Sequence, residues 1–259
     1  MIKYYMLFVE IKVMVKKYNK GEILMSKTKW EEYLEKQTEE LVKQFRGELD
    51  FPVAADNEEV LENYAKRING KVERLEKYEQ AIVINTGDRF ELFVKADEKQ
   101  YRAIFKEYLA RYYNCSDDLP REYHVDHLYN KKRFQDKYIR LILLPATINS
   151  SWGSNIEKHL TRLDSGKNRK KEYYMDYFTF LKAILFRAAK TSERETQTRK
   201  KYIEEAVEHL TKLGVFDIDD EVGRLTMTAQ LVAEFNLIEH GIWTNDEERL
   251  RKFLAKKKQ

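Results

Sequence analysis

Apolar positions spaced three and four residues apart predict three helices in the first half of the chain. These helices cover residues 27–46, a segment that begins at Asp56 and is ended by Gly70, and residues 97–113. Between the second and the third, residues 81–94 are rich in β-branched and aromatic side chains and contain a glycine near the middle, which predicts a β-hairpin.

The middle of the chain combines two short apolar runs with a polar helix start. Residues 123–128 have the pattern of a short strand, and residues 139–144 form a second apolar run that Pro145 ends. A helix is expected to begin at Asn149 and to run through Leu160. The predicted order is therefore strand, strand, helix, with polar side chains at the junctions.

The last third of the chain is predicted to be mostly helical. Apolar side chains at helical spacing indicate one helix within residues 174–188 and a second around residues 203–210. Residues 215–227 are expected to form a small hairpin, and further helices are expected from Thr228 and from Thr244. A helix followed by a hairpin is also the pattern of a winged-helix DNA-binding domain, which we keep as an alternative for this region.

An Asp-His pair in the middle segment carries the most specific chemistry. Asp126 offers a hard oxygen ligand for Mg²⁺ or Mn²⁺, and His127, with an unperturbed pKa of about 6.5, is a candidate base for activating water. Adjacent side chains of a regular strand point to opposite faces, so both reach one ion only where the strand bends or ends. Residues 129–132 have the composition of such a strand end.

The order of an Asp-His pair, an apolar run and an asparagine before a helix resembles the HNH, or His-Me-finger, nucleases, whose core is a ββα metal site. The resemblance covers roughly residues 120–165. It implies that Asp126 and Asn149 hold one divalent metal ion, Mg²⁺ or Mn²⁺, and that His127 is the general base. It also implies hydrolysis of phosphodiester bonds that leaves a 5′ phosphate. His124 and His159 are additional candidate ligands.

Arg140 departs from the family pattern. It stands where the family usually has an asparagine whose carbonyl orients the catalytic imidazole, and a guanidinium has only donors. We therefore assign Arg140 a catalytic role as a bidentate partner of the scissile phosphate, with a weakened site as the alternative. Cys115 is the only cysteine, so a structural zinc held by paired CxxC motifs is excluded.

Basic residues flank the Asp-His segment on both sides of its helix. The formal net charge of +4 is mild, and the 36% of charged residues mostly reflects solvated helix faces. Two local clusters are more specific, because they could follow a phosphate backbone bound at the metal, and we expect double-stranded DNA to be that partner. The expected DNA-contacting residues are Lys131, Lys132, Arg133, Lys167, Arg169, Lys170 and Lys171.

The expected fold class is α+β and mostly helical, with a central ββα-metal core, helical N- and C-terminal regions and one additional β-hairpin. The expected regions are a doubtful N-terminal extension at 1–24, a helical region with the hairpin at 25–114, the nuclease core at 115–165, and a helical region that is a candidate for nucleic-acid binding at 166–259. Residues 20–22 can be encoded by a bacterial ribosome-binding sequence, so translation is expected to start at Met25.

The function that we expect is a metal-dependent HNH endonuclease acting on DNA, in a restriction, phage-related or anti-phage defence setting. Two alternatives stay open: a nuclease of the same core that cleaves RNA or acts as a toxin, and a catalytically inactive nucleic-acid-binding protein. A nicking monomer and a homodimer that cuts both strands stay open as well. With no apolar run long enough to cross a bilayer and no disulfide framework, the cytoplasm is the expected compartment.

Overall fold

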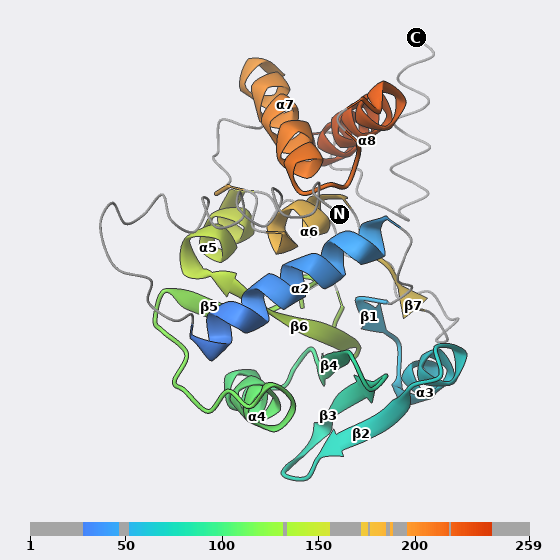
Figure 1. The fold of residues 1–259 in the computed structure, drawn as a ribbon, viewed down its shortest axis with the longest axis vertical. Helices are drawn as coiled ribbons and strands as arrows, with labels where there is room; N and C mark the ends of the chain where they lie inside the picture. The colour runs from blue at the N-terminus through green and yellow to red at the C-terminus, as the bar shows by residue number, and fades with distance from the viewer. Residues whose placement is uncertain are drawn as a thin grey trace, which may run out of the picture.

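The computed structural model describes residues 28–46, 52–131, 134–155, 172–175, 177–184, 187–188, 196–217 and 219–239 (Figure 1). The expected extension at 1–24, the start at Met25 and the helix from Thr244 lie outside these residues. No helix in the described ranges combines the length and the apolar character needed to cross a bilayer. The elements are α2 (Lys29–Phe45), β1 (Ala54–Ala55), α3 (Glu58–Arg67), β2 (Lys71–Leu75), β3 (Tyr78–Asn85), β4 (Phe90–Lys95), α4 (Tyr101–Tyr113), β5 (Tyr123–His127), β6 (Tyr138–Pro145), α5 (Ala146–Asn155), β7 (Glu172–Tyr173), α6 (Tyr177–Ala183), α7 (Thr196–Lys212) and α8 (Glu221–Glu239).

The described strands form one antiparallel sheet in the order β2-β3-β4-β6-β1-β7, and β5 pairs with β6. The backbone of Arg140 in β6 donates to Val53 O (2.9 Å) and accepts from Leu128 N (2.8 Å). Because the N–H and C=O of one strand residue point to the same side, β1 and β5 follow one another along one edge of β6. β4 lies along the other edge, so β6 is the central strand.

The central ββα-metal core that the sequence predicted is wrong for this chain. β5, β6 and α5 do follow one another, but the seven-stranded sheet that contains β5 and β6 takes its other five strands from residues 54–95 and 172–173. The physical reason is the burial of β6, in which every residue from Tyr138 to Leu144 is buried. A strand that is apolar on both faces needs cover on both, which a single hairpin and helix do not provide.

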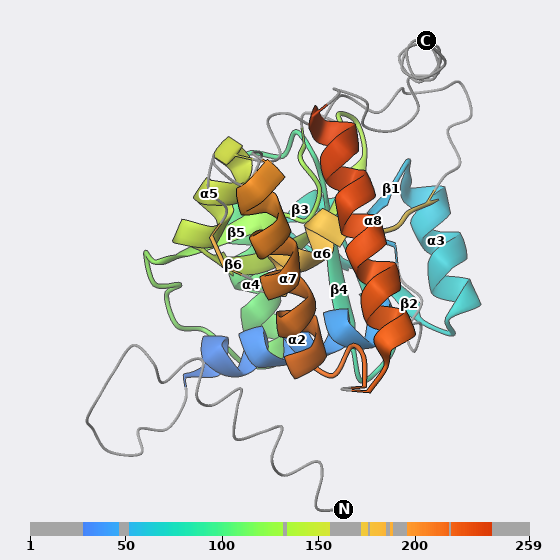
Figure 2. The ribbon, with the colours of Figure 1, turned by 90° about the horizontal axis from the view of Figure 1, so that it is seen from above.

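Helices cover both faces of the sheet (Figures 1 and 2). α4 packs on one face, where Phe105 and Val125 belong to the smaller of two buried clusters. α3, α5 and α6 lie on the other face, where Trp152 and Phe178 belong to the larger cluster, and α8 packs against both α6 and α7. The sheet therefore separates two cores, and a side chain of β5 reaches one core or the other.

The helix α2 crosses from one core to the other. Thr28 begins it with a capping box, in which its side chain and that of Glu31 each accept from the other residue's backbone N–H. Leu34 belongs to the smaller core and Leu41 to the larger. Between them, the Gln37 amide donates to the carbonyl oxygen of Leu143 in β6 (3.0 Å) and accepts from its N–H (2.8 Å). A helix side chain thus satisfies the backbone N–H and C=O groups of β6 at a point that β4 does not reach.

The hairpin predicted over residues 81–94 is confirmed as β3 and β4, with Gly87 in the turn at φ 96°. The hairpin predicted over residues 215–227 is wrong, because most of this stretch lies in α8. Its acidic turn is a helix start, in which the Asp220 carboxylate accepts from the N–H of Gly223 (2.8 Å). The winged-helix alternative loses its hairpin with this correction.

Candidate functional site

Strand β5 distributes its polar side chains between the two faces of the sheet. Val125 belongs to the smaller core, so His127, two residues further along the strand, faces the same way, toward α4. His124 and Asp126 face the opposite way, toward α5 and α6. Since β5 keeps its pairing with β6 from Tyr123 to His127, no bend brings the members of the Asp-His pair to the same face.

Two pairs of polar side chains lie on the α5 and α6 side of β5. The Nδ2 atom of Asn149, in α5, lies 3.4 Å from Nδ1 of His124. The Nζ atom of Lys182, in α6, lies 2.6 Å from Oδ2 of Asp126. We call His124, Asp126, Asn149 and Lys182 the β5 polar cluster. His124 and Asn149 are half-buried, and the Asp126 side chain is 21% exposed, so solvent reaches the cluster.

The sequence prediction missed Lys182. It lies within residues 174–188, where the apolar side chains at helical spacing predicted a helix and Lys182 was not singled out. Only 2% of its side chain is exposed, and burying an ammonium group is costly unless an anion compensates it. A lone lysine inside an apolar helical stretch was the available signal. Its partner, 56 residues earlier in the chain, was not predictable from local spacing.

His127 lies in a different environment from the one that the sequence predicted. Its ring is buried, and its centroid is 5.0 Å from that of Tyr101, the first residue of α4. Its Nε2 atom makes no hydrogen bond with the described residues. Burial lowers the pKa of His127 to about 4, so the ring is neutral at pH 7. The sheet therefore separates the predicted general base from the predicted metal ligands.

Arg140 is also placed away from solvent. It is buried, its Nη2 lies 3.6 Å from Oε2 of Glu40, and Glu91 attracts it as well. Glu91 in turn forms an ion pair with Arg89 (2.6 Å) and accepts from the Tyr64 hydroxyl (3.0 Å). We call these five buried residues the closed charge cluster. In this position Arg140 faces carboxylates rather than a surface that a scissile phosphate can reach.

The predicted DNA-contacting residues are mostly outside the described ranges. Lys131 is described, and its Nζ lies 5.7 Å from the ring centroid of Tyr101, near His127. The other candidates lie outside the described residues, and so does the additional ligand candidate: Lys132, Arg133, Lys167, Arg169, Lys170, Lys171 and His159.

The donors of the β5 polar cluster suit a hard divalent cation. Among the described residues, no group of three or more histidine, cysteine, aspartate or glutamate side chains is arranged to hold a metal. The cluster contributes two of these types, His124 and Asp126, and Asn149 adds an amide oxygen. Lys182 engages Oδ2 of Asp126 and leaves Oδ1 for another ligand. Mg²⁺ is commonly held by one or two carboxylates with water completing its shell, so this donor set fits it.

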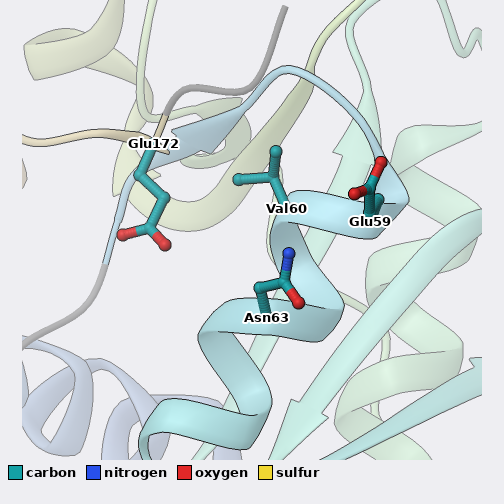
Figure 3. A pocket seen from close by; sticks show the side chains of 4 residues that line it. All are labelled: Glu59, Val60, Asn63 and Glu172. Atoms are coloured by element: carbon teal, nitrogen blue, oxygen red, sulfur yellow. The ribbon is translucent and has the colours of Figure 1, made fainter.

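A hollow elsewhere on the surface does not offer a competing phosphate site. It lies between α3 and β7 and is lined by Glu59, Val60, Asn63 and Glu172 (Figure 3). Two of the four lining side chains are carboxylates and none is basic. Glu172 is already paired with Arg67 at 2.6 Å. Such a lining repels phosphate, so the β5 polar cluster is the better candidate for phosphate chemistry.

Comparison with known proteins leaves the β5 polar cluster to be judged on its own geometry. No protein-family model matches the chain, and neither does any curated protein or solved structure. The arrangement offers a partly exposed carboxylate, an imidazole anchored by an amide, and a buried cation within one polar cluster. These groups can together bind a cation, move a proton and neutralise an anionic substrate.

Proposed function

We propose that this protein is a metal-dependent phosphodiester hydrolase, an endonuclease acting on DNA, that works from the β5 polar cluster. One observation carries the proposal. His124 and Asp126 of β5 lie on one face with Asn149 of α5, and a buried lysine from α6 neutralises the carboxylate. Of the three residues on this face, Asp126 and Asn149 are the two that the resemblance assigned to the metal.

The metal would be held by Asp126 Oδ1 and the Asn149 amide oxygen, and when bound it supplies polarisation of a phosphoryl oxygen and charge for the departing 3′ oxygen. The chain's own residues supply the rest. For Nε2 of His124 to take a proton from water, Nδ1 must carry the ring's hydrogen and donate it to the Asn149 amide, turned so that its oxygen faces Nδ1. The second lone pair of that oxygen remains for the metal.

Lys182 has two roles in this proposal. Its ammonium group fixes the orientation of Asp126 through the 2.6 Å contact with Oδ2. It also adds positive charge beneath a site that must accept a phosphate, and a charge inside a low-dielectric core acts more strongly than one in water. Lys182 is therefore a positioning residue for Asp126 and part of the electrostatic field of the site.

The geometry favours His124 over His127 as the imidazole of the site. His124 shares its face of β5 with Asp126 and lies 3.4 Å from the Asn149 amide, whereas His127 is buried against Tyr101 on the other side of the sheet. For His127 to act as the base, its ring would have to turn through the end of β5 to the opposite face. The two histidines, three residues apart on one strand, form a matched pair for mutation.

The test is a supercoiled-plasmid assay with Mg²⁺ or Mn²⁺, run with EDTA and with the variants His124→Ala and His127→Ala. We expect nicking or linearisation that EDTA and His124→Ala abolish and that His127→Ala retains. Circular dichroism of each variant checks that it is folded. Cleavage that survives EDTA would contradict the metal requirement, and loss only in His127→Ala would return the base to the residue that the sequence pattern indicated.

A second candidate function is a nucleic-acid-binding protein without catalysis. The observation that favours it is the Lys182–Asp126 ion pair, because a carboxylate already neutralised by lysine binds a cation less tightly. It predicts binding that survives EDTA and His124→Ala, with no cleavage of any substrate. Running duplex DNA, single-stranded DNA and RNA side by side separates this function from an RNA-cleaving nuclease.

A further inference from the structure

The positive and negative charges of the β5 polar cluster are balanced without a metal ion. The carboxylate of Asp126 and the ammonium group of Lys182 lie 2.6 Å apart. Asn149 is uncharged, and His124 adds no negative charge. A second carboxylate beside His124 and Asp126 would make a metal-binding group of three, and the described ranges contain no such group. The described part of the cluster therefore has no net negative charge with which to attract a cation.

Burial holds Lys182 in place. Only 2% of its side chain is exposed, and its neighbours along α6, Leu181 and Ala183, belong to the larger core. Moving the ammonium group away from Asp126 would leave it buried without that anion, which is costly. Lys182 therefore stays beside the carboxylate when another ion approaches the cluster.

A divalent cation and a phosphodiester experience this fixed charge with opposite signs. Binding of Mg²⁺ or Mn²⁺ at Oδ1 of Asp126 would put a second cation on a carboxylate that Lys182 already neutralises. A phosphodiester is negative, so the same ammonium group attracts it and offsets its repulsion by Asp126. Both effects are weakly screened, because the ammonium group is buried in a medium of low effective dielectric constant.

We propose that Lys182 makes the β5 polar cluster bind a phosphodiester before it binds the metal. Mg²⁺ in proteins is commonly held by one or two carboxylates together with substrate phosphates, so nucleic acid supplies the negative charge that the cluster lacks. This order rests on the proposed function, because it takes Asp126 and Asn149 as the metal ligands. It adds that the protein without nucleic acid holds little metal.

The test compares Lys182→Met with wild type in two binding measurements, neither of which depends on cleavage. The affinity for Mn²⁺ without DNA is measured from the electron paramagnetic resonance signal of the free ion. The affinity for a mixed-sequence DNA duplex in EDTA is measured by fluorescence anisotropy. Circular dichroism checks the fold of each variant. Lys182→Gln, which is neutral but can still donate to Asp126, takes the place of Lys182→Met should that variant fail to fold.

The matched control is Lys77→Met, which removes the same charge elsewhere on the molecule. Lys77 lies in the turn between β2 and β3, where its side chain is 78% exposed, and β2 is the edge strand at the far end of the sheet order from β1 and β7. Asp126→Asn removes the ligand carboxylate and gives the background of Mn²⁺ binding.

We expect the two affinities to change in opposite directions. Lys182→Met should bind Mn²⁺ at least about tenfold more tightly than wild type, because a positive charge next to the ligand carboxylate is removed. It should bind the duplex about 2–5-fold more weakly, the usual size for a partly solvated charge pair. Lys77→Met should change neither affinity.

The remaining outcomes separate the order of binding from the function. If Mn²⁺ binds above the Asp126→Asn background, but Lys182→Met lowers both affinities or changes neither, the order is overturned and the metal-dependent function stands. Failure of wild type to bind the duplex in EDTA would overturn the order in the same way. If neither wild type nor Lys182→Met binds Mn²⁺ above that background, the metal-dependent function is overturned, and the order falls with it.

Discussion

The β5 polar cluster and the closed charge cluster contain similar residue types but differ in their exposure to solvent. In the first, Asp126 meets one lysine, and its side chain keeps 21% of its exposure. In the second, Glu40 and Glu91 meet two arginines and a tyrosine, and all five residues are buried. An open carboxylate can offer an oxygen to a ligand from solvent, whereas a closed one lies out of the reach of solvent. The comparison therefore separates a site for chemistry from a site for stability.

Arg140 belongs to the closed charge cluster and not to the predicted active site. The sequence pattern placed Arg140 and Asp126 in one active site, but the structure places them in different clusters. A guanidinium that lies between two buried carboxylates stabilises a fold and does not bind substrate. Four predictions follow from this division, and each can contradict it.

The largest effect is expected for catalysis at the β5 polar cluster. His124→Ala should lower the cleavage rate by about 10²–10⁴-fold, the usual value of proton transfer by a positioned side chain, while leaving the fold intact. His127→Ala should leave the rate within a few-fold of wild type. Initial rates of plasmid nicking with Mg²⁺ measure both. Equal losses of cleavage rate in the two variants would contradict the conclusion that only the His124 face of β5 takes part in catalysis.

The next largest effect is expected for stability at the closed cluster. Arg140→Met should lower the free energy of unfolding by about 3–5 kcal/mol, because it leaves Glu40 and Glu91 buried with one cation fewer. Urea denaturation measures the change. Lys43→Met is the matched control, since its pair with Glu39 (2.7 Å) is solvent-exposed and worth at most about 1 kcal/mol. A stable Arg140→Met with impaired cleavage would return Arg140 to the active site.

A smaller effect distinguishes Asp126 from Lys182, the ion pair of the β5 polar cluster. Asp126→Asn should cost about 2–3 kcal/mol of stability, because it removes the negative charge that lies 2.6 Å from the buried ammonium of Lys182. Lys182→Met should cost less, because Asp126 can be hydrated and methionine fills the same volume. Urea denaturation of both variants and of the double variant measures the coupling. The reverse order would mean that Lys182 serves the core rather than the site.

The smallest effect concerns pH. Burial raises the pKa of Glu91 above its usual 4.5, although Arg140 and Arg89 oppose the shift. Because the unfolded chain then releases this proton first, the carboxyl's contribution to stability is present below pH 4.5 and is lost as pH rises through the raised pKa. The stability advantage of wild type over Glu91→Gln should therefore shrink as pH rises above 4.5. Urea midpoints at several pH values test this, and an advantage that grows with pH would contradict it.

Local patterns were enough to locate many of the described elements. The helix predicted over residues 27–46, the hairpin over 81–94 and the two strands around the Asp-His pair are present. The helix expected at Asn149 begins three residues earlier, at Ala146, so that Asn149 lies within its first turn. Propensity, capping and periodicity act over a few residues, which is the range that sequence reasoning covers well.

Contacts between distant segments were beyond that range. The pairing of Gln37 with Leu143 joins residues 106 apart, and the pairing of Lys182 with Asp126 joins residues 56 apart. The central position of β6 in a seven-stranded sheet also depends on strands contributed from both sides of it in the chain. No local pattern specifies which distant partner a buried polar group will find.

The sequence by itself determined that β5 alternates, so that His124 and Asp126 share one side and His127 takes the other. Only the tertiary structure decided what each side meets: α5 and the buried Lys182 of α6 on one, and Tyr101 of α4 on the other. The period of a strand follows from backbone geometry. The environment of each face follows from packing, because a helix is placed by the whole apolar surface that it must cover.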